Sequence, residues 1–280
     1  MNLKSKTALA ALALIASTAA MAQAAAPVPD YTLAYNVGAV SQYRFRGIEQ
    51  TSGKPAIQGG VDFAHKNGVY LGAWASNVNW VKDFNAATQG DYEVDLYGGY
   101  KAEIMPGLGY DLGLITYQYP GNNSGAAGTP GAGGFTKADT TEIYFGLSYS
   151  VLSFKYSQSM GDFLGNLNSN GSRYMELAAN FDLGDGYTLT PHVGRQTVPN
   201  QNIAGGVGVA AVTDGTAANY TDYALTLAKD FGNGWSATLA AVGTDAKDRG
   251  FYQTTPIANN GNLNRFLGSS AAVVGVKYSF

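Results

Sequence analysis

The chain ends on FLGSSAAVVGVKYSF, residues 266–280, and this stretch alternates with a period of two. One phase becomes apolar and then aromatic toward its end, at Ala272, Val274, Val276, Tyr278 and Phe280. The other phase carries small or polar residues such as Ser269, Lys277 and Ser279. Because successive residues of a β-strand point to opposite faces, the two phases face opposite sides of one strand. An apolar stripe that closes in aromatic residues is typical of a transmembrane β-strand.

The last apolar positions of this strand also carry a recognition pattern. Val276, Tyr278 and Phe280 resemble the C-terminal sorting signal of bacterial outer-membrane proteins, which end in Phe after alternating apolar residues. The resemblance implies that the barrel-assembly machinery is a partner and recognises the C-terminal strand. It also implies that the protein lies in the bacterial outer membrane, in contact with its lipid.

The first residues carry the pattern of an export signal. Lys4 and Lys6 precede an apolar run at 8–20 that is too short to span a bilayer as a helix. Small residues follow, with Ala-x-Ala sites that end at Ala22 and Ala24. We therefore expect a secretory signal peptide at residues 1–22, with an alternative cleavage point after residue 24, and export through the periplasm. Residues 23–280 are then expected to form a single outer-membrane β-barrel.

The composition differs from that of an ordinary soluble domain. Charged residues make up 13% of the chain, against roughly 25% in typical globular proteins. The 19 tyrosines suit membrane interfaces, and the absence of cysteine excludes disulfides and Cys-based zinc sites. Removing Lys4 and Lys6 from the 17 basic side chains leaves 15 against 20 acidic ones, a net charge of −5. Since no basic patch occurs, nucleic acid is not an expected partner.

After the predicted signal, about twelve alternating segments have lengths that fit tilted membrane strands. They cover residues 31–46, 55–65, 69–78, 91–102, 110–119, 140–150, 152–159, 173–182, 187–198, 220–231, 235–244 and 266–280. In the first of them Tyr35, Tyr43 and Phe45 fall in the outward phase. The segment at 91–102 begins with an acid at every second position, and that side must face water.

The connections between these segments alternate in length. Long polar ones lie at 47–54, 79–90, 120–139, 160–172, 199–219 and 245–265, and short ones include Lys66-Asn67-Gly68 and Gly232-Asn233-Gly234. Outer-membrane barrels have short periplasmic turns and long extracellular loops. The sequence therefore predicts an all-β fold, a transmembrane antiparallel up-and-down β-barrel of about 12 strands. A secreted soluble β-sandwich or barrel is the alternative, but it does not account for the signal, the tail and the loop asymmetry together.

Two stretches near the start of the barrel carry a family resemblance. They read NVGAVSQYRFRGIEQT at residues 36–51 and PAIQGGVDF at 55–63, followed by GAWASN at 72–77. Together they resemble the start of the Gcw_chp family, also called TorF family porins. The resemblance is specific over about residues 31–100, where Ala73 takes the middle position of a Gly-Cys-Trp pattern. It implies a proteobacterial, Gram-negative outer-membrane porin without implying a particular solute.

The inward phases predict a charged lumen. A barrel of about twelve strands lies between the filled eight-stranded size and the open sixteen-stranded size, so a narrow pore and a plugged barrel both stay open. The candidates for pore lining or a constriction are Arg44, Arg46, Asp62, Asp91, Glu93, Asp95, Glu142 and Glu176. Over all strands, inward acids outnumber inward bases about two to one. We therefore predict passive diffusion of small hydrophilic solutes with a weak preference for cations, because rings of acid favour cations.

The arginines and the acids of two predicted strands have two interpretations. Arg44 and Arg46 fall near the outer end of the first predicted strand, and Asp91, Glu93 and Asp95 near the outer end of the fourth. At one depth, these opposite charges would create a transverse field across a constriction. They would serve equally as ion pairs that stabilise the wall and select nothing. An anionic solute also stays a candidate, because the planar guanidinium of Arg suits carboxylate and phosphate.

The aromatic residues also have two interpretations. Trp74, Trp80 and Trp235 are most simply girdle residues at the membrane interfaces. A sugar-stacking track inside the pore would use the same residue types, with Tyr97 and Tyr144 as inward candidates.

Two other function classes stay open. A lipid-modifying barrel enzyme would need a general base, and the chain offers only His65 and His192. The sequence has no G-x-S-x-G, P-loop or H-E-x-x-H motif, so we expect no catalysis, no cofactor and no metal site. The other class is a non-conducting barrel that acts as a surface binding or adhesion protein through its Gly-, Asn- and Thr-rich loops. Loops of this composition are more typical of flexible, solvated tips.

Overall fold

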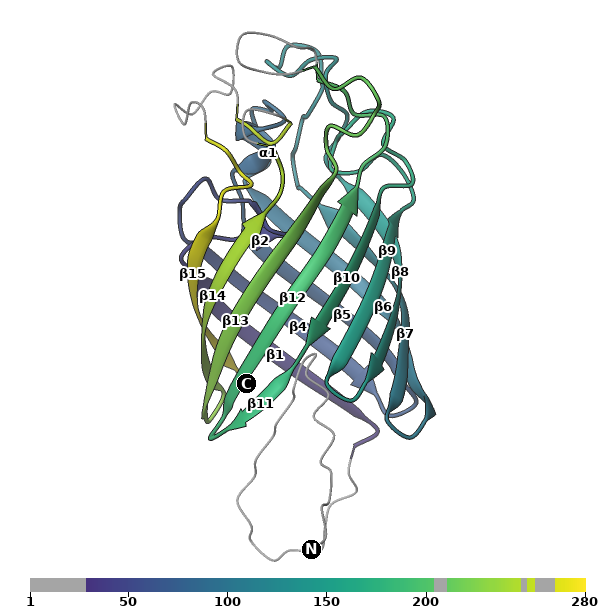
Figure 1. Ribbon diagram of the computed structural model, residues 1–280, viewed down its shortest axis with the longest axis vertical. Helices are drawn as coiled ribbons and strands as arrows, with labels where there is room; N and C mark the ends of the chain where they lie inside the picture. Colours follow the sequence, from purple (N-terminus) through teal and green to yellow (C-terminus); the bar gives the residue numbers. More distant parts are fainter. Residues whose placement is uncertain (1–28, 204–210, 248–250, 255–264) are drawn as a thin grey trace, which may run out of the picture.

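The computed structural model describes residues 29–203, 211–247, 251–254 and 265–280. The predicted signal peptide at residues 1–22 lies outside the described residues. The described chain forms a closed cylinder of tilted strands with its long loops gathered at one end (Figure 1). Within the described ranges, no helix is both long and apolar enough to cross a membrane.

The described residues form twelve antiparallel wall strands, each hydrogen-bonded to its neighbours in the ring. They are β1 (Tyr31–Val40), β4 (Ala56–His65), β5 (Val69–Asn77), β6 (Tyr92–Met105), β7 (Leu108–Gln118), β8 (Thr140–Tyr149), β9 (Leu152–Ser159), β10 with β11 (Arg173–Ala179 and Phe181–Gly184), β12 (Tyr187–Thr197), β13 (Tyr220–Gly232), β14 (Trp235–Thr244) and β15 (Ala271–Ser279). β10 and β11 both pair with β12 and form one wall strand that is interrupted at Asn180. β1 pairs with β15, so the sheet closes on itself. The predicted all-β barrel of about 12 strands is confirmed, and closure removes the free edges that lipid could not hydrogen-bond.

Short turns join the strands at one end of the barrel and long connections join them at the other. The short turns place Gly68, Asn233 and Gly234 at positive φ of 103°, 51° and 84°, as tight hairpins require. The C-terminus lies at this end (Figure 1), where Phe280 exchanges backbone hydrogen bonds of 2.9 and 3.0 Å with Tyr35. In outer-membrane barrels the end with short turns is periplasmic and the end with long loops is extracellular.

The alternation of the sequence reappears on the two faces of the wall. In β1, Leu33, Tyr35 and Val37 are exposed, and the residues that alternate with them from Ala34 to Gly38 are half-buried. In β15, Val274 and Val276 are exposed in the same way. These exposed apolar side chains form a surface that suits hydrocarbon, while the opposite phase faces the interior. The barrel therefore has the two-faced wall that an outer-membrane protein needs.

The first predicted strand, at 31–46, was too long. β1 stops at Val40, and residues 41–54 leave the wall as a hairpin that contains β2 (Arg44–Phe45) and β3 (Ile48–Glu49). Its turn places Arg46 and Gly47 at φ 49° and 78°, a left-handed conformation that a regular strand does not allow. The prediction that Arg44 and Arg46 belong to a wall strand was therefore wrong, and residues 41–54 are called the lumen hairpin below.

The last predicted strand also began too early. β15 starts at Ala271, and residues 266–270 belong to the preceding loop. Leu267, from the polar phase of the predicted strand, is 2% exposed and packs with Ile48 and Tyr220. The alternation before Ala271 therefore reflects loop packing and not a membrane strand.

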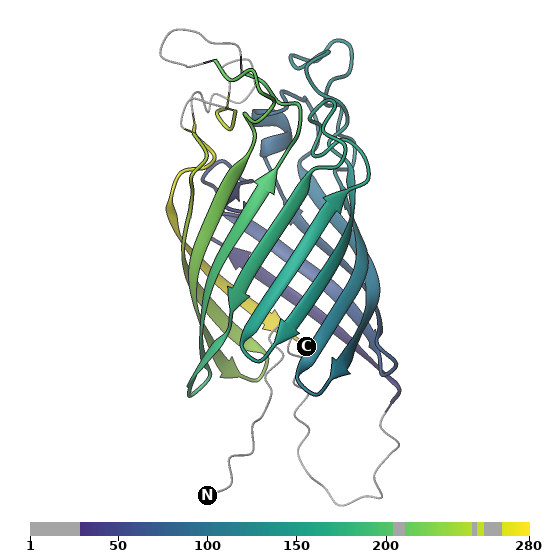
Figure 2. The same ribbon diagram turned by 45° about the vertical axis from the view of Figure 1, so that its right-hand side comes forward.

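The long loops gather at the end of the barrel away from the C-terminus (Figure 2). The packed core lies among these loops and the strand ends next to them. The short helix α1 (Trp80–Asp83) sets Trp80 and Val81 against Tyr119 and Ala138. Two more buried clusters contain Ile48, Tyr220 and Leu267, and Phe163, Val198 and Ala218. The half-buried rings of Phe45, Phe84 and Tyr252 each contact two of the three clusters and join them. Burial of apolar side chains thus stabilises the loops at this end of the barrel, as it stabilises the core of a soluble domain.

Candidate pore lining

The inner face of the wall carries buried acids. Asp62, Glu93, Asp95, Glu142 and Asp222 are each at most 9% exposed. They lie on β4, β6, β8 and β13, in the phase opposite the lipid-facing residues. A carboxylate in a membrane wall must face the interior, where hydrogen bonds and water replace its lost hydration. The strand period therefore directs the carboxylates of Asp62, Glu93, Asp95 and Glu142 toward the lumen.

The lumen hairpin crosses the interior of the barrel. Arg46 Nη1 donates to Glu142 Oε1 at 3.0 Å, and Nη2 donates to Glu142 Oε2 at 2.6 Å. Nη1 also donates to Gln196 Oε1 at 2.9 Å. Glu142 lies on β8 and Gln196 on β12, and neither strand neighbours β1 in the ring. The hairpin that follows β1 therefore reaches side chains on distant parts of the wall.

The ion pair between Arg46 and Glu142 is dry and enclosed by aromatic rings. The two side chains are 8% and 0% exposed. The guanidinium lies 4.3 Å from the ring of Tyr174 and 4.7 Å from the ring of Phe45, and the Tyr117 hydroxyl donates to Glu142 at 3.1 Å. Burial lowers the pKa of Arg46, but the Glu142 carboxylate more than offsets this effect, so the pKa is raised overall. Arg46 therefore stays charged, and the carboxylate of Glu142 compensates its charge.

Arg44 binds the lumen hairpin to the last loop of the barrel. Its Nε and Nη2 donate to Gln42 Oε1 at 2.9 and 2.6 Å. Its Nη1 donates to the carbonyl oxygens of Gly47, Leu267 and Ser269 at 3.1, 3.1 and 2.9 Å. All three nitrogens of the guanidinium are thus directed at protein oxygens.

A second ion pair joins the hairpin to the same loop. Arg265 Nε donates to Glu49 Oε2 at 2.7 Å, and Arg265 Nη2 donates to Glu49 Oε1 at 2.9 Å. The Glu49 amide also donates to the carbonyl of Leu267 at 2.9 Å. Glu49 is fully buried, so these bonds replace its hydration. The first and last loops of the barrel are therefore joined on the inner side of the seam between β1 and β15.

Glu93 and Asp95 share the inner face of β6, and no ion pair within the described ranges includes either of them. The hydroxyls of Tyr43 and Tyr119 donate to the two oxygens of Glu93 at 2.7 and 2.8 Å. Burial, followed by the charges of Glu93 and Asp95, raises the pKa of Tyr43 well above its usual range, so this hydroxyl stays a donor. Asp95 is 7% exposed, and its Oδ1 is buried with no hydrogen-bond partner among the described residues.

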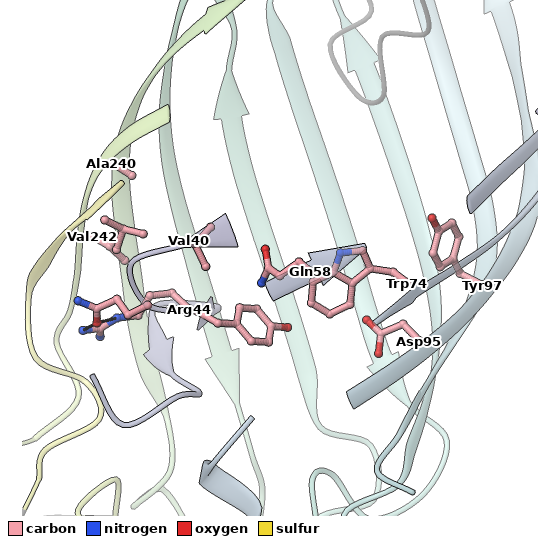
Figure 3. Close-up of a pocket in the computed structure, with 11 residues that line it drawn as sticks. Val40, Arg44, Gln58, Trp74, Asp95, Tyr97, Ala240 and Val242 are labelled. Atoms are coloured by element: carbon pink, nitrogen blue, oxygen red, sulfur yellow. Dashed lines mark hydrogen bonds between the residues drawn. The ribbon is translucent and has the colours of Figure 1, made fainter. Parts of the chain in front are cut away.

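A cavity of about 460 Å³ lies between the lumen hairpin and the wall. Figure 3 shows Arg44 at one side of this cavity and Trp74, Asp95 and Tyr97 at the other. Its volume falls within the roughly 300–1,000 Å³ typical of small-molecule sites. We call it the hairpin cavity.

The predicted opposition of arginines and acids is present in a different form. Arg46 pairs with Glu142 on β8, and no ion pair among the described residues joins Arg44 or Arg46 to Glu93 or Asp95. Arg44 and Asp95 instead line opposite sides of the hairpin cavity (Figure 3). Arg46 thus forms a buried ion pair with Glu142, whereas Arg44 and Asp95 are separated by the cavity.

The remaining predicted acids have local partners. Asp91 precedes β6 and forms an ion pair with Lys82. Asp62 accepts a hydrogen bond from the hydroxyl of Tyr97. Glu176 lies on β10, opposite Lys155 in the register of β9 and β10. These three side chains do not converge with Arg44 or Arg46 on one constriction.

The two histidines occupy different places. His65 ends β4 next to a periplasmic turn. His192 lies on β12, where its Nε2 is 3.0 Å from the Tyr174 hydroxyl and 3.0 Å from Asp222 Oδ1. Because Asp222 and Tyr174 are buried, His192 faces the interior and not the lipid.

The prediction that Trp74 and Trp80 are girdle residues was wrong. Trp74 lines the hairpin cavity, with its ring centroid 5.4 Å from that of Tyr43. Trp80 is 5% exposed in α1 and packs on Tyr119. Trp235 is 51% exposed and packs on Tyr278 near the periplasmic turns, where a girdle residue belongs.

The predicted assembly signal lies on the outside of the barrel. Val276 and Phe280 are 46% and 66% exposed, and Tyr278 is half-buried. The ring of Phe280 stacks between those of Tyr35 and Tyr278 at 5.7 and 5.6 Å. An exposed apolar stripe of this kind is accessible to an assembly factor, and recognition by one stays a prediction.

Several functional side chains were missed in the sequence. Tyr43 was assigned to the lipid-facing phase, but it lies in the lumen hairpin and lines the cavity. Gln196 carries no local signal, since its partner Arg46 is 150 residues away. Trp74 did carry a signal, because it shares its phase with Gly72 and Ser76 and not with the apolar residues between them. The period-2 pattern of β5 was therefore sufficient to place Trp74 inside.

Comparison with known families identifies one that covers most of the chain. The family described as "Bacterial protein of unknown function (Gcw_chp)" matches residues 22–280. The chain belongs to the Gcw_chp family. No curated protein matches the sequence.

Solved structures similar to this Gcw_chp protein are outer-membrane porins. The KdgM porin is 9% identical, with 88% of this chain and 99% of that chain covered and a TM-score of 0.50. KdgM in complex with disordered oligogalacturonate gives 9% identity, coverage of 89% and 98%, and a TM-score of 0.48. The NanC porin gives 11% identity, coverage of 88% and 99%, and a TM-score of 0.46. The likeness to KdgM supports the fold alone: this Gcw_chp protein is a porin-like barrel, and such a fold implies the bacterial outer membrane.

Proposed function

We propose that this Gcw_chp protein is a channel for passive diffusion of small hydrophilic solutes across the outer membrane. The observation that carries the proposal is the closed wall of twelve strands with an apolar outer face and a charged inner face. A charged lining lowers the cost of bringing a hydrated solute into the membrane.

The lumen hairpin sets the size of solute that we expect to pass. It occupies the interior with Tyr43, Arg44 and Arg46, so the free space beside it is far narrower than an empty twelve-stranded barrel. We therefore expect small conductance steps and exclusion of large oligomers.

A weak preference for cations follows from the charges near this narrow region. Asp62, Glu93 and Asp95 are buried inward acids that belong to no ion pair in the described parts of the chain, whereas Asp222 is paired with His192. Glu142 is neutralised by Arg46, and Arg44 is the positive side chain that lines the hairpin cavity. The uncompensated charge of the lining is thus negative, and negative linings favour cations.

Planar lipid bilayers test both statements. Purified protein should give discrete single-channel steps, and a KCl gradient should give a reversal potential of the sign that marks K⁺ over Cl⁻. Protein denatured by boiling serves as the control, since its barrel is lost. Absence of steps contradicts the channel, and a reversal potential of the opposite sign contradicts the cation preference.

We further propose the steps that bring the chain to its membrane. Residues 1–22 direct export to the periplasm, and the outer-membrane assembly machinery binds the C-terminal strand through Val276, Tyr278 and Phe280. The alternating apolar pattern and the exposure of Val276 and Phe280 support this assignment. We also propose that the barrel is not an enzyme, because His192 is turned away from lipid and is bound to Tyr174 and Asp222.

A second candidate function is a non-conducting barrel that acts at the cell surface as a binding or adhesion protein. The observation that favours it is the joined apolar clusters of the extracellular half, in which Phe84 packs on Phe135, Phe251 and Tyr252. If these clusters seal the mouth, bilayers containing folded protein stay silent. Heat-modifiable gel mobility together with the absence of steps would select this function over the channel.

A further inference from the structure

We propose that the hairpin cavity is a binding subsite for small organic cations, namely solutes that carry one ammonium group on a neutral body. This inference rests on the proposed channel function, because it names the class of solute that the narrow part of the lumen recognises. It goes beyond a general cation preference, since it assigns the recognition to one cavity and to particular atoms.

The first step is the hydrogen-bonding character of the lining. The hydroxyl hydrogen of Tyr43 is committed to Glu93, and that of Tyr97 is committed to Asp62. A phenol that donates its single hydrogen elsewhere can offer a solute only the lone pairs of its oxygen. Both tyrosines that line the cavity therefore act as acceptors toward anything inside it.

Gln58 and Asp95 also offer hydrogen-bond acceptors to the cavity. The Gln58 side-chain nitrogen donates one of its two hydrogens to Ser76 Oγ at 3.4 Å, and the amide oxygen of Gln58 is an acceptor. Asp95, an acceptor when ionised, lines the cavity beside Trp74 (Figure 3). A group that meets these acceptors must bring several donors, and an ammonium brings three donors and no acceptor.

Asp95 is the acidic side chain that the ammonium would meet. It is more than nine-tenths buried, at 7% exposed, and its Oδ1 has no hydrogen-bond partner among the described residues. A carboxylate held in this way pays a desolvation penalty that a bound cation would relieve. Its neighbour Glu93 differs, because Tyr43 and Tyr119 satisfy both oxygens of that side chain. The unsatisfied member of the pair is therefore the one that lines the cavity.

The aromatic and apolar side chains of the cavity favour a solute with one cationic group and a neutral body. The indole of Trp74 lies next to Asp95 (Figure 3), and an indole face attracts a cation within about 6 Å of its centroid. At the other side of the cavity, Val40, Val242 and Val273 offer an apolar surface next to Arg44. A neutral body suits these valines, and the charge of Arg44 disfavours a second ammonium at that side.

Arg44 does not turn the cavity into an anion site. Its Nε, Nη1 and Nη2 all donate to Gln42, Gly47, Leu267 or Ser269. A carboxylate that enters would find one Nη2 hydrogen left over from these bonds, and it would face the acceptors of Tyr43, Tyr97 and Asp95. Most of the charged donors that an anion needs are thus engaged, while the acceptors that a cation needs are free on the cavity side.

Calorimetric titration of the full-length mature protein in detergent tests the inference with three probes of similar shape. n-Butylammonium carries the positive charge, n-butanol is neutral and butyrate is negative. We expect butylammonium to bind at least about tenfold more tightly than either of the others, because a hydrogen bond to a charged group contributes about that factor. Equal binding of the three probes, or a preference for butyrate, overturns the inference.

Two variants and a matched control assign the binding to the cavity. Asp95→Asn keeps the side-chain volume and should remove the preference for butylammonium, whereas Asp185→Asn removes the same charge at an exposed periplasmic turn and should keep it. If Asp95→Asn fails to form the heat-modifiable barrel, Trp74→Leu should weaken butylammonium binding several-fold. If the Asp95→Asn protein, or the Trp74→Leu protein in its place, still prefers butylammonium, the binding site lies elsewhere and the inference is overturned. Because calorimetry needs no ion flow, silent bilayers with retained binding contradict the channel alone.

Discussion

The two halves of the barrel are built on different principles. In the extracellular half, Val81, Glu142, Gln196 and Leu267 are nearly or fully buried, and loops from several parts of the chain meet. In the periplasmic half, short turns join the strands, and the whole of β11 is exposed. One end therefore has the packed core of a soluble domain, and the other end is a shell.

The comparison teaches where stability and specificity come from in such a protein. The shell needs only strands that alternate apolar and polar residues and a ring of strands that closes, because lipid solvates one face and water the other. The filled end needs particular partners, such as Glu142 for Arg46, because a buried charge without a partner is costly. We expect the substitutions that matter most to lie at the filled end.

The largest effect is expected for Arg46→Met. The change leaves Glu142 charged, buried and without its partner, and loss of one member of a buried pair costs about 3–5 kcal/mol. We expect release of the lumen hairpin, seen as larger single-channel conductance, faster proteolysis within residues 41–54 and a lower urea midpoint in detergent.

The double variant Arg46→Met with Glu142→Gln is the matched control. It removes both charges, so most of the lost stability and the original small conductance should return. If Arg46→Met behaves as wild type, the ion pair with Glu142 does not hold the hairpin. The extracellular half then depends less on particular partners than we propose.

A smaller effect, seen in cells, is expected at the periplasmic end. Phe280 contacts the rings of Tyr35 and Tyr278 but is 66% exposed, so Phe280→Ala should change the stability of the folded barrel little. Its effect should appear in assembly, as a several-fold lower amount in outer-membrane fractions. Val274→Ala, in the same exposed phase, should leave that amount unchanged. Equal losses for both variants would point to general strand pairing instead of a sorting signal.

The smallest effect is expected for Asp30→Asn. Lys66 Nζ lies 2.6 Å from Asp30 Oδ1, but the two side chains are 68% and 58% exposed, and exposed pairs contribute less than about 1 kcal/mol. The urea midpoints of Asp30→Asn and Arg46→Met compare the loss of stability at the periplasmic end with that at the extracellular end in one assay. A loss at Asp30 as large as that at Arg46 would remove the distinction between shell and core.

The wall was predictable because its rule is local. In β1 and β15 a period of two separates Val37 and Val276 from their inward neighbours, and the short turns after β4 and β13 carry Asn-Gly. These patterns gave the strand count, the loop asymmetry and the inward position of Glu93 and Asp95. Each of these features can be recognised in a stretch of about a dozen residues.

The filled end was not predictable in the same way. The stretch after Val40 keeps alternating, so Arg44 looked like a wall residue. The chain instead bends away from the wall at Ser41 and Gln42 and reverses at Arg46 and Gly47, which have positive φ. The partner of Arg46 lies 96 residues away on β8, and no period reports such a contact. Trp80 was misplaced for a related reason: its residue type suits both an interface girdle and a buried core.

The bonds from the lumen hairpin to the last loop have a consequence for the order of folding. Arg44 and Glu49 bind Leu267, Ser269 and Arg265, more than two hundred residues later in the chain. These contacts need the last loop of the barrel to lie beside the first, whereas the bonds from Arg46 to Glu142 need only β8. The packing of the hairpin is therefore completed only when the C-terminal end of the chain is in place.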